Sequence, residues 1–460
     1  MLHFVFGRSG YGKTEYCFRQ IESLVKNGAD HILLITPEQY NFTAERRLLL
    51  SLKESGINKI ENSSFSRLGN EVFRLYGGNR LPVLSKGSKA VLMKKAVDSV
   101  KENLCLLNKK INSLSFITSM VKIYDELKSC DISAEQLLSV SEQIEREVLS
   151  GKLSDMSRII TAYEQLISRA YYDPADELSR LYEKLLDIAY FKGRNVFIDG
   201  FNGFVANEYK ILELIIKQAE HVTITLATDS FENRNEYNLF SYVNKNARTL
   251  KKIAENNGIA VDIVNLDKNF RMGNEALAFC EKHIFSNADI KFKEKQNDIR
   301  IYSAKSVLDE CEYISMQIKK ELRSGRKAGE IAVVCRDAER YRNEIVYAFR
   351  KYGIPYYDDE RQPVNTQPLI VFVQYLLRTA VYSFRSDDIL SMAKTGLTDM
   401  ASESISRLEN YIYLWSISGI KKWGNSFEAS PKDFAAELTE SDKKQLEELN
   451  CSREYLFSRI

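Results

Sequence analysis

An eight-residue segment near the amino end constrains the fold more than any other feature of the chain. Residues 7–14 read Gly-Arg-Ser-Gly-Tyr-Gly-Lys-Thr, which matches the pattern G-x-x-x-x-G-K-[ST] in full. The segment follows a short apolar run at 2–6, typical of a buried parallel strand, and residues 14–25 continue with apolar positions at helical spacing. A glycine-rich turn between a strand and a helix presents backbone N–H groups and a positive helix end to a phosphate. The pattern therefore predicts a phosphate-binding loop on a parallel sheet.

Every residue of this loop is a candidate for nucleotide binding. The candidates are Gly7, Arg8, Ser9, Gly10, Tyr11, Gly12, Lys13 and Thr14. In such loops the lysine reaches the terminal phosphates and the hydroxyl residue ligates Mg²⁺. We therefore expect Lys13 to bind ATP and Thr14 to bind the metal. The alternative is a glycine-rich turn that binds no nucleotide.

A second metal ligand is expected at the end of another strand. Asp199 follows an apolar run at 196–198 and is the candidate for Mg²⁺, with an ordinary Asp-Gly turn as the alternative. Many motors of this kind carry glutamate at the next position, where it orients the attacking water, but this chain has Gly200. Because loss of such a group commonly costs about 10²–10⁴ in rate, the sequence favours nucleotide binding over fast hydrolysis.

Arg271 is a further candidate for the nucleotide site. It stands in Asn269-Phe270-Arg271, directly after an apolar strand at 263–266. A guanidinium that reaches over from the edge of a sheet can pair with a terminal phosphate through two hydrogen bonds. The alternative is an ordinary surface arginine.

Two segments contain candidate contacts for a nucleic-acid strand. Gln39 follows the second predicted strand, at 32–35, where parallel sheets bind ligands. Ser64, Phe65 and Arg67 combine a hydroxyl, a ring and a cation, which can hold a phosphate and stack on a base. The alternative for each segment is a helix N-cap with a core phenylalanine.

These motifs, in their order along the chain, resemble those of the AddB subunits of bacterial AddAB helicase-nucleases. The wider similarity is to the UvrD-like helicases of superfamily 1. The segments that carry the resemblance are 7–14, 36–39, 64–68, 197–201, 269–271 and 307–356.

The resemblance implies a heterodimer with AddA that processes double-strand DNA ends for recombinational repair. In that family AddA is the translocating helicase, and AddB scans single-stranded DNA for the Chi hotspot. The resemblance also implies that this chain binds ATP and Mg²⁺. It further implies a nuclease domain with an iron–sulfur cluster, which we expect beyond residue 460.

The pattern of strands and helices predicts an α/β fold built on RecA-like parallel sheets. In chain order the predicted parts are a first sheet domain at 1–84 and 191–295, a helical insertion at 85–190, the start of a second RecA-like domain at 296–380 and the start of a second helical insertion at 381–460. We expect strands of the second sheet near 300–302 and 330–335, because both stretches are apolar.

Composition limits the partners and the compartment. Lys and Arg number 65 and Asp and Glu 63, a net charge of +2, which excludes a protein held to DNA by bulk charge alone. Seven cysteines without a C-x-x-C pair, and four histidines without paired spacing, predict free thiols and no zinc site. No apolar run approaches the ~18 residues of a membrane span, and no secretory signal is evident. We therefore expect a cytoplasmic protein.

Two other functions remain open from the sequence. A phosphate-loop kinase acting on a small metabolite would share Lys13 and Thr14. A DNA-binding scaffold would retain the loop as a vestige. The long insertion before Asp199 disfavours the kinase. The leading hypothesis is therefore an ATP-binding, helicase-like subunit of a DNA helicase-nuclease, with weak or no ATP hydrolysis of its own.

Overall fold

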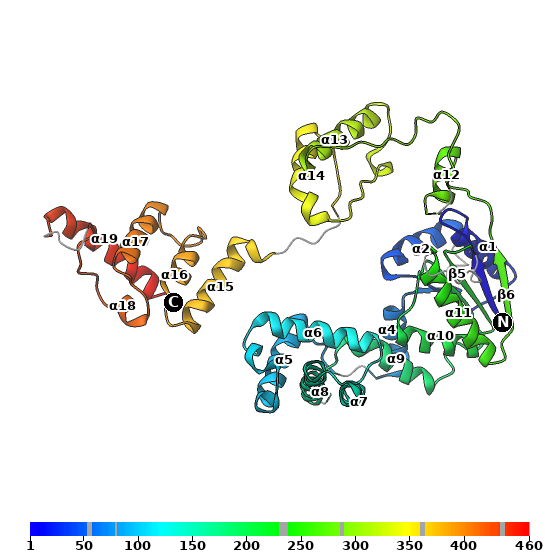
Figure 1. The fold of residues 1–460 in the computed structure, drawn as a ribbon, viewed down its shortest axis with the longest axis horizontal. Helices are drawn as coiled ribbons and strands as arrows, with labels where there is room; N and C mark the ends of the chain where they lie inside the picture. The colour runs from blue at the N-terminus through cyan, green and yellow to red at the C-terminus, as the bar shows by residue number, and fades with distance from the viewer. Residues whose placement is uncertain are drawn as a thin grey trace. The chain divides into compact units, whose positions relative to one another are not determined.

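The chain forms two compact units, Met1–Ile301 and Tyr302–Ile460. The computed structural model describes residues 1–52, 58–78, 81–168, 170–229, 238–285, 289–358, 364–432 and 438–459. Figure 1 shows the ribbon of both units with their helices and strands labelled.

An all-parallel sheet of six strands organises the first unit, in the order β3-β2-β4-β5-β1-β6. The strands are β1 Leu2–Phe6, β2 Ile32–Ile35, β3 Ile60–Ser63, β4 Asn195–Ile198, β5 His221–Leu226 and β6 Val261–Asn265. Because the strands all run in one direction, their carboxyl ends meet at one edge of the sheet. The predicted α/β fold with a parallel sheet is confirmed.

Helices cover both faces of this sheet, which is why its central strands are continuous apolar runs. The helices on one face are α1 Lys13–Lys26 and α2 Glu38–Ser51, which pack on Ile32, Leu34 and Phe197. The helices on the other face are α4 Phe65–Tyr76, α9 Glu177–Leu186, α10 Ala206–Gln218 and α11 Ser241–Asn256. They pack on the alternate side chains of the same strands, such as Leu33 and Val196. After β6 the unit continues with α12 Glu275–His283.

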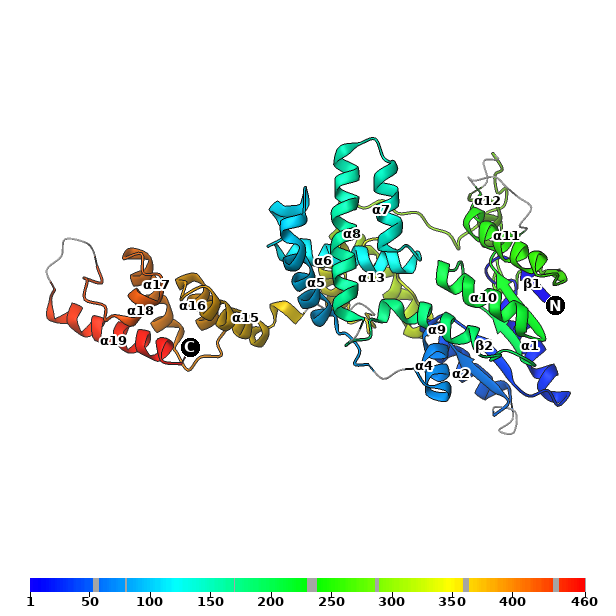
Figure 2. The same cartoon turned by 90° about the horizontal axis from the view of Figure 1, so that it is seen from below.

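A helical bundle is inserted between β3 and β4. Its elements are α5 Lys86–Val100, η1 Lys101–Asn103, η2 Leu107–Lys110, α6 Leu114–Ser129, α7 Ala134–Gln143, α8 Glu147–Ile167 and η3 Pro174–Asp176. The bundle has its own core, in which the rings of Tyr124 and Tyr163 meet edge to face at 4.9 Å. Figure 2 shows α7 and α8 side by side. The two chain segments that join the bundle to the sheet domain form a parallel bridge between Val83 and Tyr172.

A buried ion-pair network lies beside that bridge. Lys89, in α5, is 6% exposed. Its ammonium donates to Asp173 at 2.8 Å and also to Asp125. Tyr163 donates to the second oxygen of Asp173 at 3.1 Å. Because the Asp173 side chain is fully buried, its charge depends on these partners, and the network fixes the bundle to the joining segment.

The second unit consists of helices and extended segments. Its elements are α13 Val307–Arg323, η4 Ala328–Glu330, α14 Ala338–Tyr352, η5 Val364–Thr366, α15 Pro368–Val381, α16 Ser386–Ala393, α17 Ser402–Leu414, α18 Ile420–Gly424 and α19 Glu440–Phe457. Helices α15 to α19 enclose a core around Trp423, whose side chain is fully buried. The indole N–H donates to Ser386 Oγ at 3.0 Å.

The strands expected near 300–302 and 330–335 are not formed in the described part of the chain. Both stretches are extended, but neither pairs with a neighbour, and Val334 is 92% exposed. An apolar run becomes a strand only where another strand accepts its backbone hydrogen bonds. The bounds of the four predicted domains stay predictions. Among the described residues, no helix combines the length and apolar character needed to cross a bilayer.

We predict that Lys89→Ala lowers the free energy of unfolding by about 3–5 kcal/mol, because Asp173 would keep a buried charge without its cation. Urea denaturation followed by circular dichroism measures the change. Lys94→Ala is the control, since Lys94 lies in the same helix and forms a half-exposed pair with Asp98; its loss should cost less than about 0.5 kcal/mol. Equal effects of the two substitutions would contradict the assignment of Lys89 to the joint.

Candidate nucleotide site

The loop between β1 and α1 has the curled backbone that a phosphate cradle requires. Gly10 and Gly12 have φ angles of +86° and +84°, in the left-handed region that favours glycine. A Cβ atom on Gly10 would lie 2.7 Å from the Cβ of Arg271. Both the backbone and the neighbouring segment therefore require glycine at this position.

Lys13 lies inside the loop. Its Nζ donates to the carbonyl oxygens of Gly7 at 2.7 Å and Arg8 at 2.9 Å. Burial lowers the pKa of Lys13; the charge of Asp199 opposes this shift and that of Arg271 adds to it. The ammonium is thus held by the same loop whose N–H groups would surround a phosphate.

Asp199 follows β4 and offers a carboxylate oxygen to the site. Its side chain is 1% exposed, and Oδ1 accepts a hydrogen bond from Thr225 Oγ1 at 2.5 Å. Oδ2 has no hydrogen-bond partner within the described residues. A buried carboxylate oxygen without a partner is unfavourable, and a divalent cation shared with Thr14 would satisfy it. The residues present therefore fit Mg²⁺.

Gly200 has a structural reason to be glycine. Its φ is +85°, and a Cβ there would lie 3.3 Å from Cδ of Pro37. A side chain at this position would be strained in the left-handed backbone and would press on the proline. The absence of a water-orienting glutamate beside Asp199 therefore belongs to the local fold.

The segment after β6 docks on the phosphate loop. The backbone N–H of Phe270 donates to Gly10 at 2.9 Å, and Arg271 donates to Ser9 Oγ at 3.2 Å. Asn269 turns the segment by accepting from the N–H groups of Arg271 and Met272 at 2.8 and 3.0 Å. The structure thus places the Arg271 guanidinium at the loop, as the sequence suggested.

The residues of this site line a cavity of about 560 Å³ at the carboxyl edge of the sheet. Lys13, Thr14, Asp199 and Arg271 all reach it. Several lining residues were not among the candidates from the sequence, and these are Glu15, Arg47, Phe201, Asn202, Thr225 and Phe270. Phe270 directly precedes Arg271 in the sequence, but Glu15 and Arg47 project from helix surfaces and carry no local signal.

Arg8 contributes its backbone but not its side chain to the cavity. Its guanidinium pairs with both oxygens of Asp229, at 2.5 and 2.7 Å, and these hydrogen bonds raise the pKa of Arg8 further above its usual range. Tyr11 is also absent from the described lining of the cavity. The sequence motif alone treats all loop residues alike, and only the structure separates these two from Lys13 and Thr14.

The structure divides the candidate nucleic-acid contacts into two groups. Ser64 caps α4 by accepting from the N–H of Arg67 at 3.2 Å, and Phe65 is 4% exposed, with its ring 5.6 Å from that of Phe201. Phe65 is therefore a core residue whose ring is not presented to a base, and Ser64 is a helix cap. Gln39 and Arg67 are exposed beside the carboxyl ends of β2 and β3.

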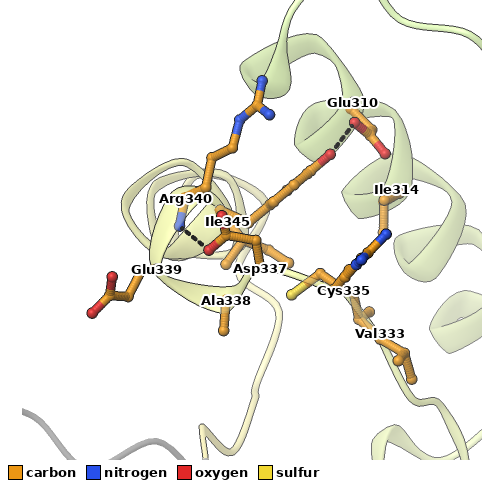
Figure 3. Close-up of a pocket in the computed structure, with 12 residues that line it drawn as sticks. Glu310, Ile314, Val333, Cys335, Asp337, Ala338, Glu339, Arg340 and Ile345 are labelled. Carbon is orange, nitrogen blue, oxygen red and sulfur yellow. Dashed lines mark hydrogen bonds between the residues drawn. The ribbon is translucent and has the colours of Figure 1, made fainter. Parts of the chain in front are cut away.

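A larger cavity, of about 900 Å³, lies between α13 and α14 in the second unit. Figure 3 shows its side chains, including the hydrogen bond in which Tyr341 donates to Glu310 at 2.8 Å. Asp337 caps α14 by accepting from the N–H of Arg340 at 3.2 Å. The residues described along this cavity include no glycine-rich loop, and much of its wall is the unpaired extended segment at 333–337. Size therefore does not identify the site, and the phosphate-binding groups do.

Comparison with known families and proteins agrees with this geometry. A family model described as AddB, N-terminal, matches residues 4–281, and one described as the UvrD-like helicase C-terminal domain matches residues 264–418. The chain is also similar to proteins whose name makes each of them a subunit of an ATP-dependent helicase/deoxyribonuclease. The one from Caldanaerobacter subterraneus subsp. tengcongensis is 31% identical over 99% of this chain and 40% of its own length. The one from Acetivibrio thermocellus is 30% identical over 98% of this chain and 40% of its own length.

A third relative of the same name, from Clostridium novyi, is 29% identical over 95% of this chain and 39% of its own length. The chain therefore spans about 40% of the length of the curated relatives it matches.

We predict that the affinity for ATP with Mg²⁺ falls as pH rises toward the lowered pKa of Lys13. Deprotonation removes the positive charge that a bound triphosphate needs, so the limiting slope is about tenfold per pH unit for one proton. Titration with a fluorescent ATP analogue between about pH 7 and about pH 10 measures it. Lys13→Arg is the control, because a guanidinium stays charged throughout. An identical alkaline decline in both proteins would refute the assignment to Lys13.

Proposed function

The chain belongs to the AddB family, and from this premise we propose that it is an ATP-binding, helicase-like subunit of a DNA helicase-nuclease that processes double-strand ends. The observation that carries the proposal is the convergence of Lys13, Thr14, Asp199 and Arg271 on one cavity. The chemistry of that set is recognition of a nucleoside triphosphate. Neither a metabolite kinase nor a scaffold with a vestigial loop gains support from any of these residues.

Each group has a distinct part in holding the nucleotide. Lys13 exchanges the carbonyls of its own loop for phosphate oxygens, and Thr14 and Asp199 hold Mg²⁺. Arg271, already at Ser9, pairs with the terminal phosphate. The ring of Phe270 is 69% exposed at the cavity, where it can stack on the base. When bound, Mg²⁺ neutralises phosphate charge.

We propose that nucleotide binding outweighs turnover in this chain. A water near the terminal phosphate would find no carboxylate at position 200, because the backbone there disfavours any side chain. Asp199 does not replace it, since one of its oxygens is bonded to Thr225 and the other is assigned to the metal. The site can thus report the presence of ATP without consuming it quickly.

The DNA strand would lie along the carboxyl edge of the sheet. Exposed Gln39 and Arg67 stand there, on α2 and α4, and can contact backbone phosphates. The family also supports AddA as the partner protein. The nuclease and its iron–sulfur cluster belong to the same proposal, but no group of three or more potential metal ligands occurs in the described ranges.

We predict that Lys13→Ala weakens ATP binding by about 10²-fold or more, since the buried ammonium is the central phosphate ligand. Isothermal calorimetry with ATP and Mg²⁺ measures it, with Lys26→Ala, at the far end of α1, as the control. In a turnover assay with single-stranded DNA, the unmodified chain should hydrolyse ATP far more slowly than the ~1–10³ s⁻¹ of typical enzymes. Unchanged affinity in Lys13→Ala would overturn the nucleotide assignment, and ordinary turnover would overturn the binding role.

We predict that Arg67→Ala lowers affinity for single-stranded DNA and reduces the salt dependence of binding by about one counterion. The effect should be uniform across sequences, because a phosphate contact does not read bases. Fluorescence anisotropy at several salt concentrations measures both quantities. Arg74→Ala is the matched control, since Arg74 is exposed in the last turn of the same helix and paired with Glu71. The same loss in both variants would count against a specific DNA path at the first turn of α4.

A further inference from the structure

An arginine from α2 reaches the nucleotide cavity and has no part in the recognition described above. Arg47 lines the cavity together with Lys13 and Thr14. Its guanidinium donates to Glu15, the residue after Thr14, and lies over the ring of Phe18 at 4.7 Å. The side chain is 40% exposed. Arg47 is therefore a cation at the cavity wall whose position is set by α1.

The partner of Arg47 can release it at little cost. Glu15 also accepts a hydrogen bond from Arg19 at 3.1 Å, one helical turn further along α1. If Arg47 leaves, Glu15 keeps a cation. The pair is also about half exposed, with Glu15 at 45%, and exposed ion pairs contribute little stability. A phosphate accepts two hydrogen bonds from a guanidinium and carries more charge, so it is the stronger partner.

The stack on Phe18 supports this exchange of partners. A guanidinium that rests on an aromatic face keeps its plane while its N–H groups turn toward another acceptor. Three cationic groups, Lys13, Arg271 and Arg47, then line the cavity against Asp199 and Glu15. This excess of positive charge suits a polyanion, and Arg47 approaches it from a different helix than the other two.

We propose that Arg47 contacts the terminal phosphate of ATP and makes α2 respond to whether ATP or ADP is bound. This inference rests on the proposed nucleotide-binding function. The consequence lies in the position of α2, because the helix that carries Arg47 begins at Glu38 and bears Gln39 in its first turn. Arg47 thus connects the terminal phosphate with the sheet edge assigned to DNA. It is a specificity-determining residue that distinguishes ATP from ADP.

The test compares ATP and ADP, each with Mg²⁺, in calorimetric titrations of the full chain. Arg47→Ala should weaken ATP binding by about tenfold or more and change ADP binding by less than about twofold, since only ATP carries the phosphate in question. Arg19→Ala is the matched control: it removes a cation from the same Glu15, but Arg19 is 76% exposed and does not line the cavity. It should leave both affinities unchanged. Equal losses for ATP and ADP in Arg47→Ala, or no loss, overturn the proposal.

A second variant and a second readout guard against a purely structural effect. Arg47→Gln keeps the stem over Phe18 and should show the same selective loss of ATP affinity. In hydrogen exchange, ATP should slow amide exchange in the first turns of α2 more than ADP does, and Arg47→Gln should abolish the difference. A difference that survives in Arg47→Gln contradicts the coupling. If the unmodified chain binds neither nucleotide, the proposed function itself fails, whereas binding without any effect of Arg47 refutes only this inference.

Discussion

The parallel pairing of β1 with β5 on one side and β6 on the other determines where every nucleotide-binding group lies. Phe6, the last residue of β1, is in register with Leu226 and Asn265. The three chain segments that leave these positions therefore emerge side by side at one edge. The contacts of the loop with Asp229 and Phe270 follow directly from this register, although both residues lie more than 200 positions away. A slip of one residue would turn alternate side chains to the wrong face.

Sequence was sufficient for the groups whose roles are set by position at a strand end. The loop glycines, Lys13 and Asp199 are such groups, because a parallel strand fixes the direction in which the chain leaves the sheet. It was insufficient for Arg47, which reaches the cavity from the middle of a helix. A helix surface carries many arginines, and only tertiary packing decides which one faces a site. Arg8 shows the converse, since a motif residue is diverted by a distant aspartate.

The same limit explains the residues assigned to DNA and the second sheet. Ser-Phe-Ser-Arg suits a ligand contact and an N-cap over a core ring equally well, and the burial of Phe65 against Phe201 decides between them. The apolar stretches near 300 and 333 have the local character of strands, but pairing is a property of two strands together. Local pattern predicts what a segment can form, and the packing around it determines what it does form.

The backbone at Gly200 gives the site its character. Its left-handed conformation places the turn after Asp199 against Pro37, the residue that precedes α2. A single substitution could not install a water-orienting acid there, because the acid would need a different backbone and a different path for Pro37. The same contact brings the metal-binding turn against the start of the helix that carries Gln39 and Arg47. The geometry that disfavours hydrolysis is thus also the geometry through which nucleotide occupancy would reach the DNA edge, and the two properties have one structural cause.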